Sequence, residues 1–131
     1  MGGFDNQLYQ NYFLFKKINS KNLETLDVND FGEYPDIICD ICSDISGLEN
    51  KYDKIICIAV LEHVYDDELA IKELHRVLKK KGIAILQVPL NLEISETIDG
   101  RDIKDGKKRN ELFGQYDHLR IYGKDFFKNK I

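Results

Sequence analysis

Residues 52–89 read YDKIICIAVLEHVYDDELAIKELHRVLKKKGIAILQVP, and this stretch decides the fold. An apolar run leads into an acidic loop, an amphipathic segment, a glycine and a second apolar run. The order predicts strand, helix and strand, because two parallel strands need a long, usually helical and right-handed crossover. The sequence therefore predicts an α/β fold with a parallel sheet. A ligand site is expected at the carboxyl ends of its strands.

The helix in this stretch is predicted over residues 67–80. Its apolar residues form one stripe: Leu69, Ala70, Leu74, Val77 and Leu78. Acidic residues open the helix and lysines close it, as the helix dipole favours. Gly82 is predicted as the residue that ends the helix. Residues 54–60 and 83–88 are the two predicted strands, and the first is so continuously apolar that both of its faces should be covered.

The same stretch resembles the second half of class I, S-adenosylmethionine-dependent methyltransferases of the type 11 kind. The shared features are an aspartate, an apolar strand, the loop Leu61-Glu62-His63-Val64, a Glu-Leu-x-Arg-Val-Leu helix, Lys-x-Gly and another strand. The resemblance implies a Rossmann-like three-layer sandwich with a mainly parallel sheet. It also implies S-adenosyl-L-methionine as cofactor and methyl transfer to a nucleophilic oxygen, nitrogen or carbon.

Weaker patterns predict the rest of the chain, which is taken as one domain over residues 1–131. A helix is expected at residues 6–18 and short strands at residues 23–28 and 35–41. Residues 91–110 are polar and are expected to form a long mobile loop. The aromatic tail after it is expected to fold back over the site, with a short helix from Lys124.

The resemblance begins partway through the family's first motif. Gly2-Gly3 resembles the family's glycine-rich turn without the strand before it, and the family's last two strands have no counterpart. A truncated domain is therefore expected. A buried central strand contributes roughly as much as the total stability of a domain. The domain should accordingly be marginally stable alone, rearranged so that neighbouring strands close the gap, or completed by a homodimer or a partner chain.

Composition narrows the class of ligand. The 131 residues carry a formal net charge of -4, which argues against a nucleic-acid surface and favours a small-molecule methyl acceptor. No apolar run approaches the ~20 residues of a membrane helix, and the first residues lack the features of a signal peptide. These observations predict a cytoplasmic protein without membrane or nucleic-acid partners.

Cys39 and Cys42 form a C-x-x-C pair, which could be a zinc half-site or a redox pair. A zinc site needs further ligands at a suitable spacing, and a redox pair prefers a helix N-terminus. Here the pair continues an apolar run, so it is predicted to end a strand with its thiols on opposite faces. Small buried side chains beside a ligand site are the expected role.

The resemblance implies a set of cofactor-binding residues in the first part of the chain. Gly2 and Gly3 would let the backbone approach the methionine part of the cofactor. Asp27 ends a predicted strand, at the spacing after Gly3 where Rossmann-like sites place an acid on the ribose hydroxyls. Val28 follows it in the same site. The alternative for Asp27 is a carboxylate that only stabilises a turn.

Five further cofactor-binding residues follow from the resemblance at the next strand ends. Asp40 would accept a hydrogen bond from the adenine amino group, and Ile41 would pack on the ring. The alternative for Asp40 is a solvated loop residue. Ala59, Val60 and Leu61 would border the sulfonium and the ribose.

His63 and His118 are the candidate catalytic residues. Imidazole changes charge near neutral pH, so His63 could act as a general base or bind the substrate; otherwise it fixes its loop, as Glu62 is expected to do. Asp117 and His118 open a D-H-x-R-x-Y-G segment that resembles one near the acceptor in a subset of the family. They could be an orienting acid and a base, or tail anchors.

Glu62, His63 and His118 could converge at the strand ends, but nothing in their spacing requires an ion, so no metal site is predicted. The favoured function is S-adenosylmethionine-dependent methyl transfer to a small-molecule nucleophile. The alternative is a non-catalytic remnant or interaction subunit that does not bind the cofactor. A nicotinamide-dependent protein would need a G-x-G-x-x-G motif, which the sequence lacks.

Overall fold

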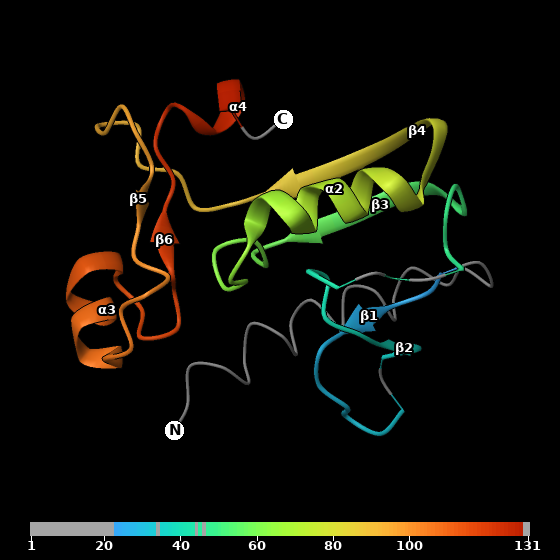
Figure 1. The fold of residues 1–131 in the computed structure, drawn as a ribbon, viewed down its shortest axis with the longest axis horizontal. Coiled ribbons are helices and arrows are strands. Elements are labelled where there is room, and N and C mark those ends of the chain that lie inside the picture. The colour runs from blue at the N-terminus through green and yellow to red at the C-terminus, as the bar shows by residue number, and fades with distance from the viewer. Residues whose placement is uncertain (1–22, 34, 44, 46, 130–131) are drawn as a thin grey trace. The chain divides into compact units, whose positions relative to one another are not determined.

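The computed structural model describes residues 23–33, 35–43, 45 and 47–129 (Figure 1). The chain divides into two compact units, Met1–Ile38 and Cys39–Ile131. Each unit is described by itself. The helix predicted at residues 6–18 lies outside the described residues.

The first unit contains two short parallel strands, β1 (Leu26–Asp27) and β2 (Ile37–Ile38), with Leu26 opposite Ile37. Asp36 ties the strands together, because its Oδ2 accepts hydrogen bonds from both the backbone nitrogen and the hydroxyl of Thr25 at 2.7 Å. The two predicted strands are therefore present, but each is shorter than the apolar run that predicted it.

The second unit begins with the predicted strand, helix and strand. These elements are β3 (Tyr52–Ile58), α2 (Asp67–Val77) and β4 (Leu78–Gln87). Strands β3 and β4 pair in parallel, with Ile56 opposite Ile85, and α2 lies along the pair (Figure 1). The parallel βαβ arrangement is confirmed.

The end of α2 differs from its prediction. The helix stops at Val77, and the backbone of Leu78 is already extended. Tyr52 pairs with Leu78 and Lys54 with Ile83, so the residues between Leu78 and Ile83 bulge out of the ladder opposite Asp53. Gly82 was wrongly predicted to end the helix, because it lies inside β4. The left-handed backbone conformation belongs to Lys81, with φ of 72°.

One face of the β3–β4 pair packs into the core. Cys57 is buried there with residues from α2 and from the tail, and the fully buried members of this core include Leu61, Ala70 and Tyr122. The other face keeps large apolar side chains exposed: Ile56 at 43%, Ile83 at 61% and Ile85 at 55%. Within the part of the chain that the structure describes, the predicted cover on both faces of β3 is not observed.

Residues 91–110 are not the predicted long loop. Strand β5 (Ile98–Asp99) pairs antiparallel with β6 (Arg120–Ile121), and α3 (Gly106–Phe113) lies between them in the chain. Asp105 caps α3 by accepting a hydrogen bond from the backbone nitrogen of Lys107 at 2.9 Å. Long-range contacts, rather than local propensity, order this polar segment.

The chain continues from β6 into α4 (Phe126–Asn129), close to the predicted short helix. Among the described residues, the strands form three separate two-stranded sheets. The architecture is thus α/β with small sheets, and the predicted three-layer sandwich is not confirmed. None of the helices that the structure describes is long and apolar enough to cross a membrane.

Candidate functional site

The candidate site is built on the loop that follows β3, residues 59–65. Ala59 turns the chain at the carboxyl end of the strand with φ of 53°, and its backbone nitrogen still donates to the carbonyl of Gln87 at 3.0 Å. The backbone nitrogen of His63 then donates to the carbonyl of Val60 at 2.9 Å. A left-handed alanine is a strained conformation of the kind that gathers at functional sites.

Arg120 holds this loop from the tail. Its guanidinium donates to the carbonyls of Leu61 at 2.7 Å, Val64 at 2.6 Å and Tyr65 at 2.9 Å, and the side chain is only 1% exposed. Its Nε donates to Oδ2 of Asp99 at 3.3 Å. One planar cation therefore fixes three carbonyls of the loop.

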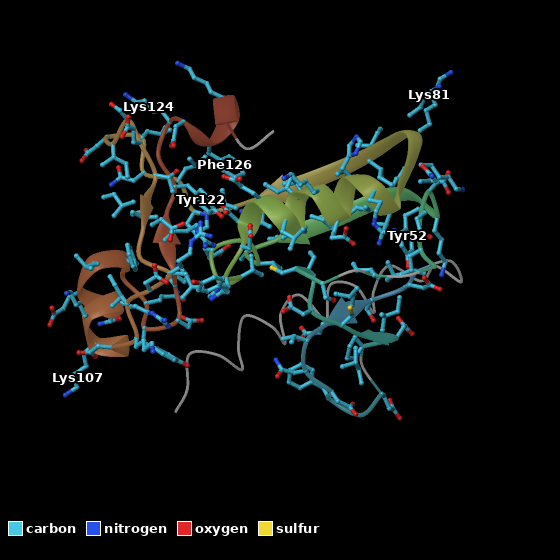
Figure 2. All side chains as sticks on the ribbon, in the orientation of Figure 1. Tyr52, Lys81, Lys107, Tyr122, Lys124 and Phe126 are labelled. Atoms are coloured by element: carbon cyan, nitrogen blue, oxygen red, sulfur yellow. The ribbon has the colours of Figure 1, made fainter. Side chains whose placement is uncertain are left out.

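Tyr122, which Figure 2 labels, also fixes this loop. Its hydroxyl lies 2.9 Å from Oδ2 of Asp67 and 3.1 Å from the carbonyl oxygen of Leu61. Asp67 is fully buried at the start of α2, and its Oδ2 lies 3.9 Å from Nε of Arg120. Burial raises the pKa of the Tyr122 hydroxyl, so this group stays a neutral donor.

Asp99 should make part of the protein's stability depend on acid pH. Burial acts to raise the pKa of Asp99, but hydrogen bonds from Arg101 outweigh it and lower the pKa to about 2. Because the pKa of Asp99 is lower in the folded state than in the unfolded state, its carboxylate contributes its full stabilisation of the fold above about pH 4. It is lost as the pH falls toward 2. We expect the stability difference between wild type and Asp99→Asn to shrink over that interval in thermal melts.

The control for this prediction is Asp53→Asn, because Asp53 is 77% exposed and pairs with Lys79, which is itself exposed. Its melting temperature should follow that of the wild type at each pH. A difference between wild type and Asp99→Asn that stays constant from pH 5 to pH 2 would contradict the assignment.

Four polar side chains gather at the loop: those of Glu62, His63, Asp117 and His118. Nδ1 of His63 lies 2.8 Å from Oδ2 of Asp117, and its Nε2 lies 3.8 Å from Oε1 of Glu62. The rings of His63 and His118 meet edge to face, with centroids 4.8 Å apart. The backbone nitrogen of Leu119 donates to the carbonyl of Glu62 at 2.8 Å. The two segments that carry the cluster are therefore directly bonded.

Burial sets the electrostatics of this cluster. Glu62 is 1% exposed, and its Oε2 has no hydrogen-bond partner among the described residues. Burial raises the pKa of its carboxyl. Burial and the neighbouring His63 lower the pKa of His118. The site thus disfavours a lone negative charge on Glu62 and a positive charge on His118.

The predicted cofactor residues are distributed over both units. Gly2 and Gly3 lie outside the described residues. In the first unit, Asp27 ends β1 and is partly buried, while Val28 is 62% exposed. In the second unit, Asp40 is exposed and its Oδ1 accepts from the backbone nitrogen of Cys42 at 2.8 Å. Ile41 is half-buried against the core.

The remaining cofactor candidates adjoin β3. Ala59 and Val60 are partly exposed. Leu61 is completely buried, and its carbonyl is occupied by Arg120 and Tyr122. The side chain of Leu61 belongs to the core of the described residues, whereas Ala59 and Val60 are accessible to a ligand.

The C-x-x-C pair does not continue a strand as predicted, because β2 ends at Ile38. Cys39 and Cys42 are free thiols that are partly rather than fully buried, and Sγ of Cys42 lies 3.2 Å from the carbonyl oxygen of Asp66. The pair therefore belongs to a turn.

The tail holds two relationships that the sequence analysis missed. Asp117 pairs with His63 and not with the adjacent His118, and Arg120 clamps the loop. The signal for the clamp was present, since His118, Arg120 and Tyr122 alternate in the sequence and all three are buried. Alternation places such residues on one face of an extended segment.

Comparison with known proteins gives one match. A family model described as a methyltransferase domain matches residues 16–86, more than half of the chain. The matched range contains the elements from β1 to α2 and all of β4 except Gln87. No curated protein and no solved structure matches the chain.

Proposed function

The chain belongs to the methyltransferase domain family, and from this premise we propose that it catalyses S-adenosylmethionine-dependent methyl transfer to a small-molecule nucleophile. The family match carries this proposal, because members of the family generally bind S-adenosylmethionine. When bound, the cofactor supplies an electrophilic methyl group on a sulfonium. The protein's task is then mainly to bind and align the reactants. We also propose that the chain has the Rossmann-like three-layer sandwich fold of the family.

Asp27 fits the role of ribose ligand. Its Oδ1 accepts from the backbone nitrogen of Asn29 at 2.9 Å, which closes a turn at the end of β1. Within the part of the chain that the structure describes, Oδ2 accepts no hydrogen bond, so it can accept from a ribose hydroxyl. The residue can therefore stabilise its turn and bind a ligand at the same time. Val28 beside it offers an exposed apolar surface.

Asp40 and Ile41 fit the role of adenine ligands by the same reasoning. One carboxylate oxygen of Asp40 closes a turn, and the residue is exposed enough to accept a hydrogen bond from an amino group. Ala59 and Val60 complete the proposed cofactor residues of the second unit. The strained backbone at Ala59 holds them at the carboxyl end of β3, where ligands of α/β proteins bind.

His63 and His118 are proposed to face the methyl acceptor. Asp117 fixes the ring of His63, which leaves Nε2 as the atom that accepts a proton from an attacking hydroxyl or amine. His118 is held neutral by burial and can accept a hydrogen bond from the same acceptor. The net charge of -4 supports a small acceptor over a nucleic acid, whose phosphates need a basic surface.

Calorimetric titration with S-adenosylhomocysteine, the product form of the cofactor, tests this proposal. We expect saturable binding to the wild type and about 10- to 100-fold weaker binding to Asp27→Ala. The reason is that hydrogen bonds to a charged group contribute about 1.5–3 kcal/mol. The matched control is Asp30→Ala, because Asp30 closes a similar exposed turn with the backbone nitrogen of Gly32. Its affinity should equal that of the wild type.

Two results would count against the proposal. The absence of any heat from a wild-type sample that circular dichroism shows to be folded would favour the non-catalytic alternative. Equal loss of affinity in Asp27→Ala and Asp30→Ala would show that binding depends on the loop conformation that the two turns stabilise. A direct contact between the Asp27 carboxylate and the ligand would then not explain the loss.

A further inference from the structure

We propose that Glu62, His63 and His118 bind a divalent transition-metal ion of the zinc class at the carboxyl end of β3. One ligand atom from each of the three side chains lies within 4.8 Å of the other two. The proposal concerns binding of the ion alone and does not depend on the proposed methyl transfer. We call these three residues the Glu62 cluster.

The strongest observation is the carboxylate of Glu62. The residue is almost completely buried, and its Oε2 has no partner among the described residues. A buried carboxylate with an unsatisfied oxygen is costly, and such groups are normally paired or coordinate a metal. Oε1 faces Nε2 of His63 at 3.8 Å, which is too long for a hydrogen bond. A cation bound by Glu62 would give its unsatisfied Oε2 a partner.

Asp117 gives His63 the orientation of a metal ligand. A metal-bound histidine usually donates its second ring N–H to a carboxylate, which fixes the tautomer and makes the ligand nitrogen more basic. Nδ1 of His63 lies 2.8 Å from Oδ2 of Asp117, so the proton is expected on Nδ1. The lone pair is then on Nε2, the atom that faces Glu62. The arrangement has this form without the ion.

The distances allow coordination after a small contraction. Zinc binds nitrogen and carboxylate oxygen at about 2.0–2.2 Å, so two ligands in a tetrahedral site lie about 3.4 Å apart. The separation of 3.8 Å between Glu62 and His63 is close to this value. The remaining separations, at most 4.8 Å, must shorten by up to about 1.4 Å. His63 is partly exposed and can move, and the Leu119–Glu62 backbone bond keeps the two ligand segments together.

The ligand set resembles a catalytic rather than a structural zinc site. Two imidazoles and one carboxylate leave the fourth tetrahedral position open to water or substrate. An oxygen bound there loses its proton more readily. With the ion bound, Nε2 of His63 would coordinate it and could not accept a proton. The ion would then activate the acceptor oxygen instead.

Titration of the metal-free wild type with Zn²⁺ tests the site directly. The chain is first treated with a chelator and exchanged into buffer, and binding is followed by calorimetry and by thermal melting. We expect one high-affinity equivalent per chain and a higher melting temperature with the ion, because a ligand that binds only the folded state stabilises it. Co²⁺ should give the visible absorption of a tetrahedral nitrogen and oxygen site.

Substitutions locate the ion. Glu62→Gln and His118→Gln should each weaken Zn²⁺ binding at least about 100-fold, and Asp117→Asn, outside the ligand set, about 10- to 100-fold. His75→Gln removes an exposed histidine of α2 and is the matched control. A Cys39→Ser, Cys42→Ser double variant controls for thiol binding. Both controls should bind Zn²⁺ as the wild type does.

Several outcomes would overturn the proposal. If the folded wild type shows no saturable Zn²⁺ binding, the proposal is overturned by that result alone. This holds even if a variant of the Glu62 cluster fails to fold. Binding that survives Glu62→Gln and His118→Gln, or that the cysteine variant abolishes, would place the ion elsewhere. If the two cluster variants do not fold, unchanged binding by folded Asp117→Asn would also count against the site. S-adenosylhomocysteine binding is measured separately, so failure of one proposal is distinguishable from failure of the other.

Discussion

Replacing Arg120 with alanine is expected to lower the free energy of unfolding by about 3–5 kcal/mol. The substitution removes the guanidinium that binds three loop carbonyls, of which that of Leu61 keeps only the Tyr122 hydroxyl. It also removes one of two arginines whose side chains lie 3.9 Å from the buried carboxylate of Asp67. Breaking a buried charge pair from one side is among the most damaging single changes. Urea denaturation followed by circular dichroism measures the loss.

Arg101 offers a matched control for Arg120. It also pairs with Asp99, but its side chain is 29% exposed, so Arg101→Ala should lower stability by about 1 kcal/mol or less. Arg120→Lys should recover little, because a single ammonium cannot reach three carbonyls as the planar guanidinium does. A loss from Arg120→Ala no larger than that from Arg101→Ala would show that the clamp contributes nothing special.

Replacing Phe126 with alanine should lower the free energy of unfolding by about 3–5 kcal/mol. Phe126 is 2% exposed, and its ring meets that of Tyr122 edge to face with centroids 4.8 Å apart (Figure 2). It belongs to the same core as Leu61 and Ala70. Truncation would therefore open a cavity beside the candidate site. Urea denaturation again measures the effect.

Leu92→Ala is the surface control for Phe126, since Leu92 is 62% exposed and should tolerate truncation within about 0.5 kcal/mol. Phe126→Leu keeps most of the buried volume and should retain most of the stability. If Phe126→Ala and Leu92→Ala are equally mild, the tail is not part of the cooperative core.

The βαβ unit could be predicted because its signals are local. The apolar run of β3 and the apolar stripe of α2 each match one secondary-structure period, and both elements are observed. The end of α2 could not be predicted this way. Leu78 continues the helical stripe, but its pairing with Tyr52 draws it into β4. Tertiary pairing overrides propensity at that point.

The order of residues 91–110 was missed for a related reason. This segment is polar, so its sequence is typical of a loop. It is fixed by distant partners: Oδ1 of Asp125 accepts from the backbone nitrogen and hydroxyl of Thr97, and the nitrogen of Gly100 donates to the carbonyl of Leu119. A single sequence gives no local sign of such contacts.

The candidate site was predictable in its location but not in its pairings. Residues 61–64 follow β3 as expected, so the structure places His63 after the carboxyl end of a strand. The pairing of His63 with Asp117 joins segments far apart in the sequence. The near-complete burial of Glu62 depends on the tail that packs over it. Neither follows from spacing, because both depend on how β6 docks.

The distance along the chain between Arg120 and its loop has a consequence for biosynthesis. The carbonyls that Arg120 binds lie 55 to 59 residues earlier. At roughly 5–20 residues per second, a ribosome needs about 3–12 s to add that length. During those seconds the nascent chain can form α2, and β4 then follows. The loop is not yet bound by Arg120. The candidate site is therefore completed only once the chain has been extended to Arg120, after the strand and helix that carry the loop.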